Sequence, residues 1–94
     1  MIDKIIHEPA RFKIMTHLYV VESADFLFLK GQTELSWGNL SSHIAKLEKE
    51  GYVKVKKKFK GKKPNTMLEL TDKGRTAFDK YRIDMKKVLD DVSK

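Results

Sequence analysis

Apolar residues in the first part of the chain recur at three- and four-residue spacings, which is the pattern of helices packed against a core. A first helix begins near Pro9, since proline suits the first turn of a helix. A second, shorter helix follows, capped by Ser23 or Asp25 and ending near Gly31 or a few residues beyond it. The apolar face of the first helix consists of Phe12, Ile14, Met15, Leu18, Tyr19 and Val21. The second helix is apolar enough to be largely buried, through Ala24, Phe26, Leu27 and Leu29.

A third helix is predicted after the polar stretch at 32–34. Ser36 is placed to cap it, and Gly51 is placed to end it. Leu40, Ile44 and Leu47 lie on one face of this helix and point inward. Three helices therefore follow one another along the chain.

The hydrophobic period then changes from about 3.6 residues to 2, which indicates strands. Val53 and Val55 share one face with lysines on the other, and Phe59 is in phase further along. Glycine, proline and asparagine in the segment 60–65 are turn formers. In the next strand Thr66, Leu68 and Leu70 share one face, and Met67 and Glu69 share the other. The two strands form a β-hairpin.

A long last helix, over about residues 72–92, is capped by Thr71. Its apolar residues recur at steps of 3, 4, 3 and 4, a period near 3.5 that is typical of helices packed against another helix. This seam consists of Phe78, Tyr81, Met85, Val88 and Val92, with Ala77 and Leu89 beside it.

The chain has 94 residues, 40% of them apolar, which is enough for one modest core and predicts a single domain over 1–94. Cysteine is absent, so disulfides and thiolate metal sites are excluded, and a reducing compartment is compatible. The longest apolar stretches are too short to span a membrane, and the N-terminus lacks a signal-peptide pattern. We therefore expect a cytoplasmic protein that does not associate with membranes.

Positive charge is concentrated in one short segment. The net charge is +7, from 20 Lys and Arg against 13 Asp and Glu, and the isoelectric point is near 9.6. Residues 54–63 hold seven lysines and no acid, so basic and acidic residues are equal in number outside this segment. A lysine run alone is usually a solvated surface, but here it coincides with a hairpin that follows three helices. That context favours a polyanion, and nucleic acid first, as the partner.

The predicted fold is α+β and mostly helical: a winged helix-turn-helix of three helices, a β-hairpin wing and a long C-terminal helix. In such a fold the third helix enters the major groove and the wing reaches phosphates or the minor groove. With the inward stripe assigned, Gly38, Asn39, Ser42 and Lys46 point outward, and Trp37, Ser41 and His43 lie on the flanks. Asparagine can read adenine through two hydrogen bonds, and glycine permits a close approach to DNA.

The predicted DNA-binding residues lie on the third helix and the wing. They are Trp37, Asn39, Ser41, Ser42, Lys46, Lys58, Lys60, Lys62 and Lys63. An alternative remains open, in which Trp37 packs under the turn and Asn39 and Ser42 are ordinary solvated residues.

Several segments resemble the MarR/ArsR-like winged-helix transcription regulators. The most specific are NLSSHIAKLEKEGYV, the glycine-proline wing and the LTDKGR that opens the last helix, and HEPARFKIMTHL is similar to the first helix of these proteins. The resemblance covers nearly the whole chain. It implies a dimer that binds DNA through the third helix and wing, and a regulator that usually represses. The metal-sensing branch uses cysteines, which this chain lacks, so metal sensing is not implied.

A homodimer is predicted because the seam of the last helix is long for the surface of so small a domain. The predicted interface consists of Ile5, Ile6, Phe78, Tyr81, Met85, Val88, Leu89 and Val92. Alternatively, the first part of the seam, Ala77, Phe78 and Tyr81, packs on the first helix of the same protomer. A two-fold dimer would read double-stranded DNA with half-sites roughly 34 Å apart, and hence an approximately palindromic operator.

No cofactor, metal or enzymatic activity is predicted. His7, His17 and His43 lack the spacing of a helical metal site, and the chain has no cysteine nucleophile or phosphate-binding glycine loop. Two other functions remain open: a winged-helix module that binds proteins without specific DNA binding, and RNA binding. RNA is disfavoured because Phe59 is the one aromatic in the lysine run. The sequence identifies no small-molecule effector.

Overall fold

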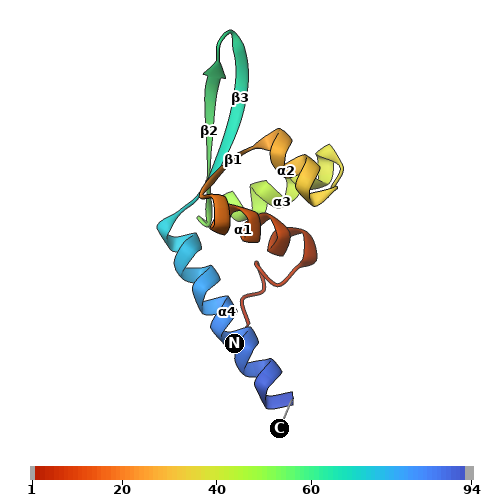
Figure 1. The fold of residues 1–94 in the computed structure, drawn as a ribbon, viewed down its shortest axis with the longest axis vertical. Coiled ribbons are helices and arrows are strands. Elements are labelled where there is room, and N and C mark those ends of the chain that lie inside the picture. The colour runs from red at the N-terminus through yellow and green to blue at the C-terminus, as the bar shows by residue number, and fades with distance from the viewer. Residues whose placement is uncertain (1, 93–94) are drawn as a thin grey trace.

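Residues 2–92 of the computed structural model contain four helices and a three-stranded antiparallel sheet (Figure 1). The predicted order of three helices, a hairpin and a long last helix is confirmed. The elements are α1 (Pro9–Val21), β1 (Ser23–Asp25), α2 (Phe26–Thr33), α3 (Trp37–Lys49), β2 (Val53–Lys60), β3 (Lys63–Leu70) and α4 (Asp72–Val92).

Each helix begins at a side chain that accepts hydrogen bonds from its free backbone N–H groups. Glu8 accepts from the N–H groups of the second and third residues of α1, and Pro9 occupies the first position. Asp25 caps α2 and Ser36 caps α3. The Thr71 hydroxyl accepts from the N–H group of the third residue of α4 and donates to the carbonyl of Gly51. The predicted caps at Ser36 and Thr71 are therefore confirmed, and Asp25 is the cap of α2.

The sheet has the strand order β1-β3-β2. The sequence predicted the hairpin of β2 and β3 but not β1, which pairs with β3 over three residues, from Ser23 opposite Glu69 to Asp25 opposite Met67. So short a strand has no periodicity of its own to detect. Its position is determined by β3, which lies far along the chain.

The hairpin turn is shorter than predicted. β2 and β3 are joined at Gly61 and Lys62, and the predicted turn formers Pro64 and Asn65 lie in β3. Gly61 has a φ of 69°, which glycine adopts without strain. Proline is tolerated in the strand because β1 pairs with β3 only over residues 67–69, so one edge of β3 is open at Pro64.

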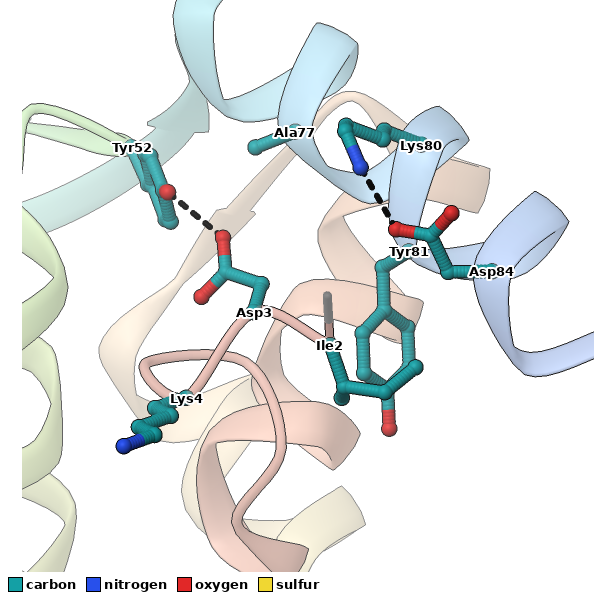
Figure 2. Close-up of a pocket in the computed structure, with 8 residues that line it drawn as sticks. All are labelled: Ile2, Asp3, Lys4, Tyr52, Ala77, Lys80, Tyr81 and Asp84. Carbon is teal, nitrogen blue, oxygen red and sulfur yellow. Dashed lines mark hydrogen bonds and ion pairs between the residues drawn. The ribbon is translucent and has the colours of Figure 1, made fainter. Parts of the chain in front are cut away.

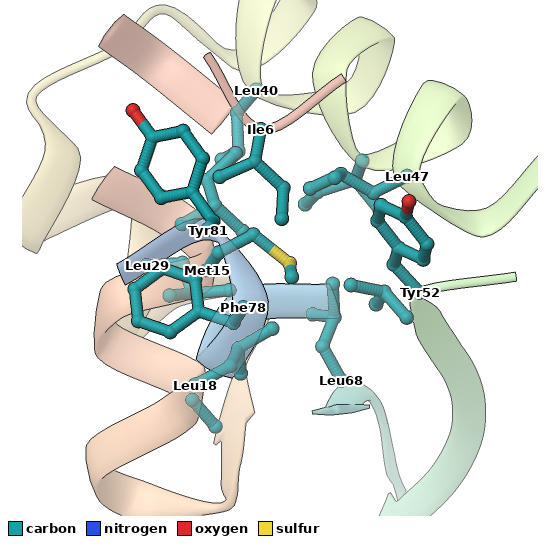
Figure 3. Close-up of a cluster of buried hydrophobic side chains, with 14 residues drawn as sticks. Ile6, Met15, Leu18, Leu29, Leu40, Leu47, Tyr52, Leu68, Phe78 and Tyr81 are labelled. Atoms are coloured by element: carbon teal, nitrogen blue, oxygen red, sulfur yellow. The ribbon is translucent and has the colours of Figure 1, made fainter. Parts of the chain in front are cut away.

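The core lies where α1, α3, α4 and the base of the hairpin meet (Figure 3). Gly51, with a φ of 84°, turns the chain between α3 and β2. Fully buried side chains come from every part of the chain: Ile6, Ile14, Met15, Leu18, Leu29, Leu40, Leu47 and Leu68. The inward stripe predicted for the third helix is confirmed.

The prediction that the second helix is largely buried is wrong. Only Leu29 and Thr33 of α2 are buried, whereas Leu27 and Phe28 are exposed. The helix has eight residues, so only one side of its two turns can contact the core. Helix α4 is partly buried in the same way, since its buried residues end at Tyr81 and the helix then continues beyond the body (Figure 1). None of the helices within residues 2–92 is long and apolar enough to cross a membrane.

Candidate nucleic-acid interface

One face of α3 is open to solvent. Leu40, Ile44 and Leu47 occupy the inner face, which leaves the outer face to small and polar side chains. Ser36 uses its hydroxyl to accept from the N–H group of Asn39, at 3.2 Å. The exposed residues of α3 include every residue of the third helix predicted to contact DNA; they are Trp37, Gly38, Asn39, Ser41, Ser42, Ala45, Lys46, Glu48 and Lys49.

Trp37 packs against α2 and is also exposed to solvent, and its contact with DNA stays a prediction. Its ring stacks on Phe26 of α2, with 5.4 Å between centroids and 6° between planes. The ammonium group of Lys30 lies 5.4 Å from the ring centroid. The side chain is nonetheless 52% exposed. Trp37 therefore joins α2 to α3 by stacking on Phe26, and about half of its side chain is open to solvent at the first residue of α3.

A charged cluster anchors the back of α3 to α1. The Arg11 guanidinium is buried, donates to the carbonyl of Ile5 at 2.6 Å, and contacts Nδ1 of His43 on α3 at 3.1 Å. Glu8 lies 3.4 Å from the same His43 nitrogen and 3.7 Å from Arg11. Partial burial acts to raise the pKa of Glu8, but two backbone N–H donors and the charges of His43 and Arg11 outweigh it and lower the pKa. The cluster positions α3 from behind and leaves its outer face free.

Sequence reasoning did not identify Arg11 as a structural residue. A signal was available, because Arg11 precedes Ile14, Met15 and Leu18 at the three- and four-residue spacings of the inward face of α1. A charged residue in an inward position requires buried partners, and here His43 and the Ile5 carbonyl supply them. Which partners they are depends on the tertiary structure.

The hairpin carries the charge. Lys56 pairs with Glu69 across the strands, at 3.1 Å, and is half-buried. The other lysines of the run are exposed: Lys54, Lys57, Lys58, Lys60, Lys62 and Lys63. Glu69, opposite Lys54 at the base, is the one acidic residue of the two strands, so the lysines nearer the turn have no acidic residue opposite them. Figure 1 shows the hairpin extending well past the helices, where a phosphate backbone can reach it.

A pocket of about 420 Å³ lies between the N-terminal segment and α4 (Figure 2). The Tyr52 hydroxyl donates to Asp3 at 2.6 Å, and Lys80 donates to Asp84 at 2.6 Å. These four polar side chains of the pocket are thus paired with one another, and no nucleophile lies beside a general base among the residues that line it. No group of three potential metal ligands occurs within residues 2–92. The hydrogen bond from Tyr52 to Asp3 holds the N-terminal segment in place beside this pocket.

The seam of α4 is divided between the protomer's core and its surface. Phe78 and Tyr81 are buried, their rings lying 6.2 Å and 5.8 Å from that of Phe12 on α1, and Ile6 is fully buried as well. These three residues were predicted to contact a partner. They are largely covered within the protomer, which is the alternative packing considered for Phe78 and Tyr81, and contact of Tyr81 with a partner through the groove that it lines beside Met85 stays a prediction. Ile5 and Met85 are half-buried, and Val88, Leu89 and Val92 are exposed.

Residues 10–89 match the family of winged helix DNA-binding domains. The uncharacterized protein MJ0432 of Methanocaldococcus jannaschii is 40% identical over 78 residues, which cover 83% of this chain and 85% of that protein. The transcriptional regulator homologue protein from Pyrococcus horikoshii OT3 superposes with a TM-score of 0.89 at 33% identity, covering 96% of this chain and 89% of its own.

Two more distant structures have the same fold. NadR in complex with 4-hydroxyphenylacetate has a TM-score of 0.74 at 21% identity, covering 94% of this chain and 64% of its own. The transcriptional regulator PA4135 has a TM-score of 0.76 at 21% identity, covering 90% and 62%. Two of the three solved structures, the one from Pyrococcus horikoshii and PA4135, are described as a transcriptional regulator or a homologue of one. With an exposed third helix, a lysine-rich wing and a family match over residues 10–89, the chain is a DNA-binding regulator that belongs to the family of winged helix DNA-binding domains.

Proposed function

We propose that the protein is a sequence-specific regulator that binds double-stranded DNA and represses transcription. The observation that carries the proposal is the combination of an open polar face on α3 with an unneutralised lysine hairpin in the same domain. The first feature suits base edges, which distinguish sequences, and the second suits phosphates, which supply affinity.

In this proposal α3 lies in the major groove. Asn39 reads a base through its amide, Ser42 and Lys46 support it, and Ser41 and Trp37 contact the groove edge or the phosphates at the start of the helix. The wing lies on phosphates or in the minor groove through Lys58, Lys60, Lys62 and Lys63. The whole chain, 1–94, acts as a single DNA-binding domain, with α4 as its dimerisation helix.

The proposed active form is a homodimer on an approximately palindromic operator. Support comes from the outer part of α4, where Val88 and Val92 are exposed in line with Met85. A groove of about 510 Å³, lined by Phe12, Tyr81, Arg82, Met85, Lys86 and Leu89, lies beside it and could receive an apolar side chain of a second copy. Because the proposed ligand is operator DNA, we infer that the protein acts in the cytoplasm.

Selection of binding sites from a random duplex library, followed by affinity measurements on one variant, tests the proposal. Asn39→Ala should weaken binding to the selected duplex by about 1–3 kcal/mol, because alanine cannot form the two hydrogen bonds to a base. Binding to random duplex should change much less. Thr76→Ala, at an exposed position of α4, is the matched control and should bind both duplexes as the unaltered protein does.

Two outcomes would contradict the proposal. If the library yields no preferred sequence, the protein does not bind DNA specifically, and the alternative of a protein-interaction module gains support. If Asn39→Ala weakens binding to selected and random duplexes equally, Asn39 contacts a phosphate or has a structural role, and the assignment of base reading to it is wrong.

A further inference from the structure

An aromatic side chain stands exposed near the end of the wing. Phe59 is 78% exposed, although phenylalanine is usually buried. Its cross-strand partner is Pro64, which is also exposed. Lys60 and Lys63 form the next pair toward the turn, so the two apolar residues lie just behind the tip.

The register places this pair on a defined face of the hairpin. Side chains of directly paired residues lie on the same face, and successive pairs alternate. Phe59 and Pro64 therefore share a face with Val53 and Leu70, and with Val55 and Leu68, at the base of the hairpin. The pair of Lys57 and Thr66 lies on the same face between the base and Phe59. The opposite face carries Lys54 with Glu69, Lys56 with Met67, Lys58 with Asn65, and Lys60 with Lys63. The exposed apolar pair thus continues the core-facing side of the sheet beyond the body of the protein.

Nothing in residues 2–92 covers this pair, since the helices end before the outer part of the hairpin (Figure 1). An apolar surface surrounded by lysines requires a partner with negative charge outside and an apolar interior. Duplex DNA has this arrangement, with phosphates lining the groove and stacked bases inside it. Apolar side chains, including phenylalanine and proline, enter minor grooves and separate base steps in proteins that bend DNA.

We propose that Phe59 and Pro64 form an apolar wedge that enters the minor groove next to the site of α3, partly unstacks one base step and bends the duplex. The inference rests on the proposed DNA-binding function and adds to it a mode of contact that the lysines cannot provide. Lysines interact with phosphates as point charges and do not depend on base stacking. The wedge does depend on base stacking, because the free energy needed to open a base step varies with the DNA sequence.

The wedge makes Phe59 a specificity-determining residue without a hydrogen bond to a base. Pyrimidine–purine steps are the most easily unstacked. Sites selected by the unaltered protein should therefore carry such a step at a fixed distance outside the sequence read by α3. Sites selected by Phe59→Ala should lack this preference and keep the central sequence.

The test uses the full chain and a selected duplex that carries a fluorophore pair at its ends and 2-aminopurine at the flanking step. Phe59→Ala should weaken binding by about tenfold, the equivalent of removing one base–aromatic stack. It should also abolish the 2-aminopurine signal and straighten the duplex. The slope of affinity against salt should stay unchanged, since every lysine of the wing is retained. Phe59→Leu should retain most of the bend, because leucine also serves as a wedge.

Lys60→Gln with Lys62→Gln is the matched control. It should lower the salt slope by up to about 0.9 for each phosphate that is no longer neutralised, and it should leave the bend in place. Phe59 lies outside the core, so its variants should unfold at the same temperature as the unaltered protein. Measuring thermal unfolding checks that these variants are folded.

The outcomes separate the wedge from the function on which it rests. If the unaltered protein binds no duplex, the proposed function fails and the wedge fails with it. If the unaltered protein binds DNA, and Phe59→Ala bends and unstacks the duplex as much as the unaltered protein does, only the wedge is overturned. Binding of the protein to phosphatidylserine vesicles in a Phe59-dependent way, with duplex binding independent of Phe59, would assign the pair to a lipid surface and also overturn the wedge.

Discussion

At the scale of single residues, alanine substitutions at two helical glycines distinguish an effect on stability from an effect on DNA binding. An added Cβ at Gly31 in α2 or at Gly38 in α3 would meet no atom within 4 Å. Alanine at either position should therefore raise the free energy of unfolding by about 0.5–1 kcal/mol, because glycine is the weaker helix former. Denaturant unfolding of Gly31→Ala and Gly38→Ala measures this effect.

The same two variants should differ in DNA binding. Gly38 lies on the outer face of α3, between Trp37 and Asn39, where a methyl group would hold the helix away from the groove. We expect Gly38→Ala to weaken binding to the selected duplex by roughly fivefold, about 1 kcal/mol. Gly31→Ala should leave affinity unchanged and serves as the control. Equal affinities for the two variants would mean that the α3 backbone does not approach DNA closely at this point.

Gly74 presents the opposite case. A Cβ there would lie 2.1 Å from the carbonyl oxygen of Tyr52, closer than atoms can approach. Helix α4 thus packs against the backbone at the start of β2 only because residue 74 has no side chain. The glycine belongs to the LTDKGR segment, so one part of the family resemblance has this packing as its physical cause.

At the scale of elements, a hydrogen bond ties the N-terminal segment to the start of β2. Tyr52 donates to one oxygen of Asp3, and the other oxygen accepts from the N–H groups of Ile5 and Ile6. Burial, then the hydrogen bond to Asp3, and then the charges of Asp3 and Glu50 raise the pKa of Tyr52 well above its usual value near 10. The segment is held in the position that buries Ile6.

This arrangement predicts a loss of stability in alkali. A folded-state pKa above the unfolded one means that the contribution of Tyr52 is complete below about pH 10 and is lost as pH rises further. Tyr52→Phe should be less stable by about 1 kcal/mol at pH 7, since the hydrogen bond cannot form and Asp3 keeps an unpaired oxygen. Its stability should fall less steeply than that of the unaltered protein as pH rises above about 10. Parallel profiles in denaturant titrations would exclude Tyr52 as the titrating group.

Elements with a local cause were predictable from the sequence, and elements with a tertiary cause were not. The inward stripe of α3 and the caps at Ser36 and Thr71 depend on nearby residues, and all are confirmed. Strand β1 exists only because β3 reaches it, and the position of His43 depends on Arg11, 32 residues earlier. Exposure of α2 likewise depends on what the fold leaves uncovered. The DNA-contacting assignments rest on exposure and remain predictions.

At the scale of the whole molecule, the domain is elongated, with principal extents of 57 × 26 × 21 Å. The wing extends from one end and α4 from the other (Figure 1). Helix α4 is anchored to α1 through its first half, where the Tyr19 hydroxyl donates to Asp79 and Phe78 is buried. In the second half Met85 still packs against the core, whereas Val88 and Val92 are exposed on the surface that a partner would cover.

Dimerisation through this half can be tested by charge substitution. Met85→Lys with Val88→Lys should shift the protein to monomer in sedimentation at micromolar concentration, because lysines would be buried in an apolar interface. Each of the two substitutions should raise the dissociation constant of the dimer by at least about tenfold. Affinity for a duplex with two half-sites should fall, and affinity for one half-site should not. Thr76→Lys, exposed on the anchored half of α4, is the control and should remain dimeric. If the unaltered protein sediments as a monomer and the double variant binds both duplexes as the unaltered protein does, the dimer and the palindrome are overturned together.

The outer hairpin has a thermodynamic consequence for how the free protein meets DNA. Between positions 57 and 66 no side chain is buried, so backbone hydrogen bonds and cross-strand neighbours alone hold this part of the wing. Segments with so little burial open locally at small cost in free energy, and their amide protons exchange with solvent quickly. Complex formation must restrict these motions, and the resulting decrease in conformational entropy is subtracted from the attraction of the lysines for phosphate. The length of the wing therefore extends its reach along the duplex and at the same time lowers the affinity that its charge would otherwise give.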